Sequence, residues 1–446
     1  MIGDKRTGAA WLTLAMVLMA EPALAQRAGE NAVASADDAF GSNVGLESTG
    51  IYTENDTRGF NPTKAGNVRI DGIYFDPVFV ISGRLKASTA IRVGFASEDY
   101  PFHAPTGIVD HRFRPFPEEN GTSRGVTRTG YGGTIGEWDL RLRTGDGKLA
   151  LTGGLAYADN RFNDGTANKS WGWTVRPIVR LGQTEIAPFA AVGRFVRNRT
   201  HTLVTVGNAT GLPEFPQRRL DLAQPWAVGR LHNETYGVTV KSAITEKLSL
   251  RAGNFAEIYS LLDASGRSAH RVIADPEQDV HSTSGEVQLA WRHSAGAWQH
   301  RLIVGVRGRS RLTETGGSDV VTSAATPVYG SPDPIAERPF VFRPVNQGRV
   351  RQMSFMLGYT GELAGLGSIN LGLQKARYRA TNLAGATGTV TRSRDNPWLY
   401  NATVGFDLSR ELSAYIGSET GLLDSGTAPE NPTHRNDQPP STRSTR

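Results

Sequence analysis

The hydrophobic and polar residues of this chain alternate along most of its length after residue 134. At residues 236–240, 287–291, 355–359 and 402–408, apolar side chains occupy every second position, and polar or small residues stand between them. A period of two predicts β-strands with one apolar face and one polar face. We count about twelve such segments of about ten residues each, which is the strand length of a transmembrane β-barrel.

The connections between these segments alternate between short and long. Tight hairpin turns are predicted at residues 144–147, 181–183, 244–246, 293–297, 361–365 and 409–410. Long polar stretches cover residues 158–170, 196–234, 256–281, 309–350 and 377–397. Short turns at one end and long loops at the other are typical of outer-membrane barrels, whereas a soluble β-sandwich has Greek-key connections. We therefore expect an antiparallel barrel wall.

Aromatic residues gather near the ends of the predicted strands. A membrane barrel carries girdles of aromatic side chains at both membrane–water interfaces. We expect these girdles to contain Trp138, Trp171, Trp173, Trp291, Trp298, Trp398, Tyr400 and Tyr415.

The N-terminus has the pattern of a secretory signal peptide. A basic region at residues 4–6 precedes an apolar run at residues 9–20, and Ala23-Leu24-Ala25 forms an A-x-A cleavage site. The apolar run is too short for a membrane-spanning helix. We assign residues 1–25 to the signal peptide and the small, polar residues 26–37 to a flexible arm.

A distinctive polar stretch lies between this arm and the strands. It contains Arg58-Gly59-Phe60, followed by Val68-Arg69-Ile70-Asp71-Gly72, and Asp-Gly is a strong hairpin signal because such turns need positive φ. This ordered set resembles the plug domain of TonB-dependent outer-membrane receptors. The resemblance includes residues 38–41, 51–52 and 100–102, and it continues through residues 104–110.

The resemblance implies an all-β fold in which an N-terminal plug lies inside a transmembrane antiparallel β-barrel. We assign residues 38–117 to the plug, with strands at 67–74, 75–84 and 90–95, and residues 118–133 to a linker. The barrel covers residues 134–424, and residues 425–446 form a polar tail. Plugged transporters have about 22 strands, so we interpret the barrel as incomplete and the chain as truncated. A smaller closed barrel of about twelve strands is the alternative.

Composition excludes several other classes of protein. The chain has no cysteine, so no disulfide framework is possible, and its net charge of +6 is modest for 446 residues. No basic run with interleaved aromatics indicates a nucleic-acid interface. We find no catalytic motif and no histidine pair at metal-ligand spacing. We therefore expect no enzyme, no cofactor, no metal site and no nucleic-acid partner.

The resemblance implies import of a scarce solute, most simply a ferric siderophore, through an outer membrane whose lipid surrounds the barrel. TonB and its inner-membrane energising complex would pull on the plug, although residues 26–37 contain no convincing coupling box. The plug motif is Arg58, Gly59, Phe60, Asp71 and Gly72, and we expect Arg58 to pair with an acid of the barrel lumen such as Glu286. The candidate ligand contacts are Tyr52, Arg84, Tyr100, Phe102 and His103.

Two other functions stay open at this point. A secreted or surface β-sandwich could bind a ligand such as a carbohydrate without entering a membrane. A non-functional truncated receptor is the second possibility, because a barrel that lacks strands has an open edge whose backbone groups lipid cannot satisfy.

Overall fold

The computed structural model describes residues 42–44, 47–49, 61–92, 102, 107–198, 224–262, 264–268, 271–323, 335–409, 412–422 and 442–445. Its regular secondary structure is entirely β. None of these residues belongs to a helix that is long and apolar enough to cross a membrane. The strands form one very large sheet, one six-stranded sheet and one small three-stranded sheet.

The six-stranded sheet is the plug, and its order is β2-β1-β5-β6-β3-β4. Its strands are β1 (Ser42–Val44), β2 (Glu47–Thr49), β3 (Val68–Ile70), β4 (Ile73–Tyr74), β5 (Lys86–Arg92) and β6 (Ile108–Phe113). The predicted hairpin is confirmed: Asp71 and Gly72 have φ values of 52° and 80° and join β3 to β4. Residues 75–84, which we predicted as a strand, form none. Amides in that segment bond to barrel side chains instead of to a neighbouring strand.

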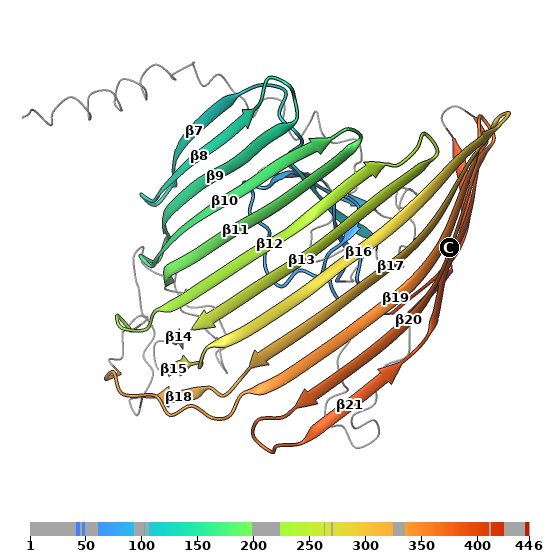
Figure 1. Cartoon of the computed structure of the whole chain (residues 1–446). Coiled ribbons are helices and arrows are strands. Elements are labelled where there is room, and N and C mark those ends of the chain that lie inside the picture. The colour runs from blue at the N-terminus through green and yellow to red at the C-terminus, as the bar shows by residue number, and fades with distance from the viewer. Residues whose placement is uncertain are drawn as a thin grey trace, which may run out of the picture.

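The large sheet is the barrel wall, and it has 15 strands that pair antiparallel (Figure 1). Its first half contains β7 (Gly121–Arg128), β8 (Thr134–Arg143), β9 (Leu149–Arg161), β10 (Ala167–Leu181), β11 (Thr184–Asn198), β12 (Gly229–Ala243) and β13 (Leu248–Leu262). Its second half contains β16 (Gln278–Ala295), β17 (Trp298–Thr315), β19 (Asn346–Leu363), β20 (Gly367–Leu383), β21 (Val390–Asp395), β22 (Trp398–Asp407), β23 (Ser413–Gly421) and β24 (Thr442–Thr445).

Three of these 15 strands lie where polar composition predicts none. Strand β7 falls in the predicted linker, β21 in a predicted loop, and β24 in the predicted tail. Each of these three strands pairs with a single neighbour at an edge of the sheet. Backbone hydrogen bonds to that neighbour hold such a strand in place, so its sequence need not alternate between apolar and polar residues. The remaining strands are the twelve that the pattern predicts. No pairing joins β7 to β24 among the described residues, so that part of the sheet is open.

The connections alternate as predicted. Tight turns join β8 to β9, β10 to β11, β12 to β13, β16 to β17 and β19 to β20, all at one end of the wall. The longer connections lie at the other end, which we call the loop end. There β14 (Ala264–Ser268), β15 (Arg271–Ala274) and β18 (Asp319–Thr322) pair as a small sheet. The predicted long loop at 158–170 is wrong, since β9 and β10 extend until only residues 162–166 separate them.

Cross-strand pairing separates the inner face of the wall, which contacts the plug, from the outer face. Directly opposed residues of an antiparallel pair share a face. The outer face carries exposed apolar side chains such as Val304, Phe355 and Leu371. Trp171, Trp291 and Trp398 are exposed on the wall at 38%, 43% and 60%, which agrees with the predicted aromatic girdles.

The plug and the inner face share one apolar core. Phe75 of the plug meets Phe255 of β13 edge to face at 5.6 Å, and Phe113 meets Phe189 of β11 at 4.9 Å. Phe189 and Phe255 are themselves 6.1 Å apart. All four rings belong to one buried cluster. The plug therefore packs on the wall as the two layers of a single core do.

This core predicts that Phe255→Ala separates plug from wall. We expect the free energy of unfolding to fall by about 3–5 kcal/mol, because a fully buried aromatic ring leaves a cavity. Urea unfolding of the purified protein in detergent measures this loss. Leu302→Ala, which removes an outer-face side chain that is 40% exposed, is the control and should cost much less. Equal losses in the two variants would contradict a core shared by plug and wall.

Candidate functional site

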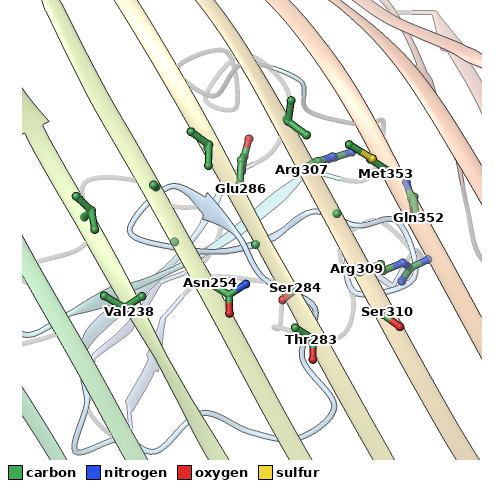
Figure 2. Close-up of a pocket in the computed structure, with 17 residues that line it drawn as sticks. Val238, Asn254, Thr283, Ser284, Glu286, Arg307, Arg309, Ser310, Gln352 and Met353 are labelled. Carbon is green, nitrogen blue, oxygen red and sulfur yellow. The ribbon is translucent and has the colours of Figure 1, made fainter.

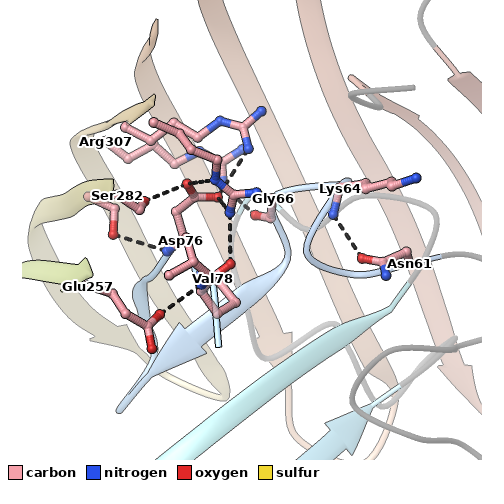
Figure 3. A network of polar contacts seen from close by, with 12 residues as sticks. Asn61, Lys64, Gly66, Asp76, Val78, Glu257, Ser282 and Arg307 are labelled. Carbon is pink, nitrogen blue, oxygen red and sulfur yellow. Dashed lines mark hydrogen bonds and ion pairs between the residues drawn. The ribbon is translucent and has the colours of Figure 1, made fainter. Parts of the chain in front are cut away.

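The centre of the plug–wall interface is Asp76, whose carboxylate bonds to two arginines of β17. Arg309 Nη1 donates to Asp76 Oδ1 at 3.1 Å, and Arg311 donates from Nη2 to Oδ1 at 2.8 Å and from Nε to Oδ2 at 3.0 Å. The Ser282 hydroxyl donates to Oδ2 at 2.7 Å. The Asp76 amide donates to the Ser284 hydroxyl at 3.0 Å. Figure 3 shows Asp76 of the plug beside Ser282 of the wall.

The spacing of residues along β17 produces this arrangement. Arg307, Arg309 and Arg311 occupy alternate positions, so all three point to the inner face. Three like charges on a buried face need acidic or carbonyl partners. Asp76 takes two of them, while Arg307 donates to the Gly66 carbonyl at 3.3 Å and lies 5.0 Å from the centre of the Tyr74 ring.

The charge balance shifts the pKa of Asp76. Burial by itself would raise the pKa of this carboxyl group, but the positive charges of Arg309 and Arg311 and the hydrogen bond from Ser282 outweigh it. The pKa therefore lies below the ordinary value of 3.8. Asp76 is an anion at neutral pH.

A second ion pair joins the plug hairpin to β16. Arg69 Nη1 lies 3.4 Å from Glu286 Oε2, and both side chains are 0% exposed. The same oxygen accepts the Tyr74 amide at 2.6 Å, and Gln288 donates to Glu286 Oε1 at 2.8 Å. The carboxylate thus has partners on both oxygens, which a buried charge requires. The plug residue that pairs with Glu286 is Arg69 and not the expected Arg58, which lies outside the described residues, so a pair made by Arg58 stays a prediction.

Other polar contacts tie the plug to more distant strands. Arg84 bonds Glu137 and Asp139 of β8 at 2.6 Å each. Asp71 pairs with Lys241 of β12 at 3.1 Å. The Val78 amide donates to Glu257 of β13 at 2.8 Å. These contacts hold the plug to wall strands from β8 to β17.

A cavity of about 440 Å³ opens between plug and wall toward the loop end. Lys64, Phe79 and His111 line it from the plug, and Val280 and Arg311 line it from the wall. Arg311 thus belongs both to this cavity and to the Asp76 contact. The cavity combines cationic groups with an aromatic ring, a lining that suits an anionic, aromatic ligand.

The predicted plug-motif and ligand-contact residues do not lie together in one site. Asp71 and Gly72 form the plug turn that contacts the wall. Arg84 forms an ion pair with Asp139 of β8. Phe102 is buried in a cluster with Ala290, Ile303 and Met356 of the wall. Tyr52, Gly59, Phe60, Tyr100 and His103 lie outside the described residues.

Sequence reasoning did not single out Asp76, Arg309, Arg311 or Lys64. The alternation of Arg307, Arg309 and Arg311 was a signal that could have found the interface. Three arginines on one face of a strand predict an acidic partner from another segment.

The outer face also has a hollow, of about 590 Å³ (Figure 2). The register aligns Val238, Asn254, Gly285, Gly308 and Met353 in one row across five strands. The two glycines leave space in this row between larger apolar neighbours. This row lies on the face opposite the plug, but Ser284, Glu286, Arg307 and Arg309, which make plug–wall contacts, also line the hollow.

A plug seated on the inner face of a transmembrane β-wall is the architecture of a plugged outer-membrane transporter. No protein-family model matches the sequence, and no curated protein matches it. Solved structures of siderophore receptors do match.

The siderophore receptor PiuA of Acinetobacter baumannii aligns with a TM-score of 0.65 and 15% identity, over 86% of this chain and 61% of that chain. The ferric-catecholate import receptor Fiu of E. coli K12, in its closed form, aligns with a TM-score of 0.67 and 13% identity, over 87% and 63%. The outer-membrane ferripyoverdine receptor of Pseudomonas aeruginosa aligns with a TM-score of 0.65 and 13% identity, over 83% and 52%.

The chain therefore has the plug-and-barrel fold of TonB-dependent siderophore receptors. It spans 61%, 63% and 52% of the lengths of these three chains. The neighbours are transport receptors rather than enzymes. The expectation of a plug-and-barrel receptor fold is confirmed.

The interface predicts that Asp76→Asn loosens the plug. Arg309 and Arg311 would lose their counter-charge, and breaking a buried pair in this way costs about 3–5 kcal/mol. We expect faster amide hydrogen exchange over residues 73–80. Asp146→Asn is the control: its carboxylate lies in the exposed β8–β9 turn near Lys148, where such pairs contribute about 0–1 kcal/mol. Unchanged exchange in Asp76→Asn would contradict the proposed role.

The same contact predicts a pH dependence. The folded pKa of Asp76 lies below its unfolded value, so its contribution to stability is complete above about pH 4 and is lost as pH falls through the folded pKa. We expect the part of the protection of residues 73–80 that Asp76 contributes to be constant between about pH 7 and 5 and to decline below about pH 4. The measurement is the difference in exchange free energy between the wild type and Asp76→Asn. A difference that stays constant down to about pH 2 would contradict this assignment.

Proposed function

We propose that this protein is an outer-membrane receptor that binds a ferric siderophore and imports it when TonB displaces the plug. The observation that carries the proposal is the seating of the plug on the inner face of the wall through buried ion pairs. Such pairs give the seat a defined geometry, while their net contribution to stability is small because each charge loses hydration. A plug held in this way can be released without loss of the barrel.

The cavity at the loop end is the proposed ligand site. Its lining of Lys64, His111, Phe79 and Arg311 favours an anionic chelate with aromatic or catechol-like groups. The loop end faces the outside of the cell in a barrel with short periplasmic turns. A ligand would therefore reach the cavity from the medium.

Arg311 connects ligand binding to release of the plug. It donates to Asp76 and to the Pro77 carbonyl and also lines the cavity. An anion bound in the cavity would compete with Asp76 for this guanidinium. Ligand binding then weakens one plug–wall contact, and TonB acts on a plug that is less firmly held. Arg69–Glu286 lies outside this cavity and would keep the hairpin in place until force is applied.

The alternative of a β-sandwich binding protein does not fit the fold. A sandwich packs two sheets of similar size face to face, whereas one sheet here holds 15 strands and covers a smaller plug. The remaining alternative, a receptor fold without transport activity, is an outcome of the uptake experiment.

The function is tested by uptake of radioactive iron in cells that lack their own siderophore receptors and produce this protein. We expect uptake of iron bound to an anionic catecholate siderophore that requires both this chain and TonB. A neutral hydroxamate chelate is the comparison. Surface localisation and heat-modifiable migration are measured on the same cells. A folded surface barrel that gives no TonB-dependent uptake of either chelate would contradict the proposal.

The cavity predicts different effects for two substitutions. Lys64→Gln should weaken siderophore binding by roughly 10- to 100-fold, the value of one charge-assisted hydrogen bond, with no change in plug exchange. Arg311→Gln should weaken binding similarly and also increase exchange over residues 73–80. Tryptophan fluorescence measures the binding, and Lys148→Gln in the exposed turn is the control. Equal behaviour of Lys64→Gln and the control would place the ligand elsewhere.

A further inference from the structure

Six arginines lie together on the outer face of β19, β20 and β21 near the loop end. Arg311 points inward to Asp76, so its neighbour Leu312 points outward. Leu312 is directly opposite Arg349, and Arg349 is opposite Thr381. Pairing therefore assigns the same outer face to all members of what we call the arginine patch: Arg349, Arg351, Arg377, Arg379, Arg392 and Arg394. All six are exposed.

Three of these arginines stand in one row. Arg351 of β19 is directly opposite Arg379 of β20, and Arg379 is directly opposite Arg394 of β21. Like charges opposed across strands destabilise a sheet. A row of three guanidinium groups therefore needs an anion to offset the repulsion.

The protein does not supply that anion within the described residues. No ion pair involves any of the six arginines there. The register places Glu314 and Asp279 on this face of the neighbouring strands. Glu314 accepts a hydrogen bond from Gln347 at 2.9 Å, and Asp279 accepts one from Ser260. The positive charge of the patch is left for an external partner.

The residues around the arginine patch indicate its depth in the membrane. Directly toward the turn end, the outer face becomes apolar, with Met353, Phe355 and Leu357 on β19 exposed at 42%, 44% and 48%. Lys375 and Trp398 lie in the same row as Phe355, next to the row of Arg377. Trp398 is 60% exposed, and Lys375 Nζ is 5.0 Å from the centre of its ring. Aromatic and basic residues in this order mark the boundary between hydrocarbon and headgroups. The arginine patch is therefore at headgroup depth, at the loop end.

The patch also has room for a headgroup. A cavity of about 470 Å³ is lined by Arg349, Arg351, Arg379 and Arg392, with Leu312 and Thr381 beside them. Guanidinium groups bind phosphate oxygens in bidentate fashion. Four guanidinium groups around one cavity can bind a group that carries several anionic oxygens, such as a phosphate ester.

We propose that the arginine patch binds the phosphate-bearing headgroup of a lipid in the outer leaflet of the membrane. In a Gram-negative outer membrane, the phosphorylated glycolipid lipopolysaccharide has this chemistry. The inference rests on the outer-membrane placement in the proposed function, but not on any ligand or on TonB. The acyl chains of the lipid would cover the apolar band, while its phosphates neutralise the row of arginines.

The experiment compares two triple variants of the full-length protein, purified in non-ionic detergent. The patch variant is Arg349→Gln, Arg351→Gln and Arg379→Gln. The control, Lys148→Gln, Lys247→Gln and Arg292→Gln, removes the same charge from the turn end. Binding of purified lipopolysaccharide, dephosphorylated lipopolysaccharide and inorganic phosphate is measured for each by surface plasmon resonance. Siderophore binding is measured in parallel.

We expect the patch variant to bind lipopolysaccharide on the order of 100-fold more weakly, since each basic residue near an anionic surface contributes about one kcal/mol. The control should bind as the wild type does. The wild type should bind dephosphorylated lipopolysaccharide at least about 10-fold more weakly, and millimolar inorganic phosphate should not displace the lipid.

Equal binding by the patch variant and the control would overturn the proposal. Displacement by inorganic phosphate would also overturn it, in favour of a free-anion site. If the patch variant does not fold, the wild type's preference for phosphorylated lipid, and its decline with added salt, decide the question. Loss of siderophore binding with retained lipid binding would count against the proposed function alone.

Discussion

The carboxylate of Asp76 between Arg309 and Arg311 is the contact on which the relation of plug to wall depends. Asp76 is fully buried, and so is most of Arg309. Neither charge could stay in this position without the other, because an unpaired buried charge costs several kcal/mol. The plug segment that follows β4 is therefore defined by the wall and not by a strand of its own. This is why residues 75–84, apolar enough for a strand, do not form one.

The same physical rule organises the two faces of the wall differently. On the inner face, the charges of Arg69, Glu286 and Asp76 find partners within the protein, so the face is buried and specific. On the outer face, Met353 and Phe355 are exposed apolar side chains, and the arginines beyond them have no acidic partner among the described residues. The fully buried ion pairs thus belong to the plug–wall interface. The arginines of the proposed lipid site have no ion-pair partner among the described residues.

Arg311 gives the proposed receptor a direct route from ligand to plug. Its guanidinium contacts Asp76 and Pro77 on one side and the loop-end cavity on the other. A residue with two competing partners couples their occupancies, and the coupling is reciprocal. No other residues are needed to connect the cavity with the Asp76 contact, because the Arg311 side chain belongs to both.

Local pattern was enough to predict the twelve long strands, the alternation of turns and loops, and the Asp71-Gly72 hairpin, because each depends on periodicity or on φ at one turn. It also indicated the plug-and-barrel fold through motifs such as Val68–Gly72. The pairing of the charges, in contrast, depends on how the plug packs against the wall. Asp76 and Arg311 are far apart in the chain, and no local pattern states that the plug places one against the other. Strands β7, β21 and β24 likewise depend on a neighbour's backbone, so their polar sequences did not predict them.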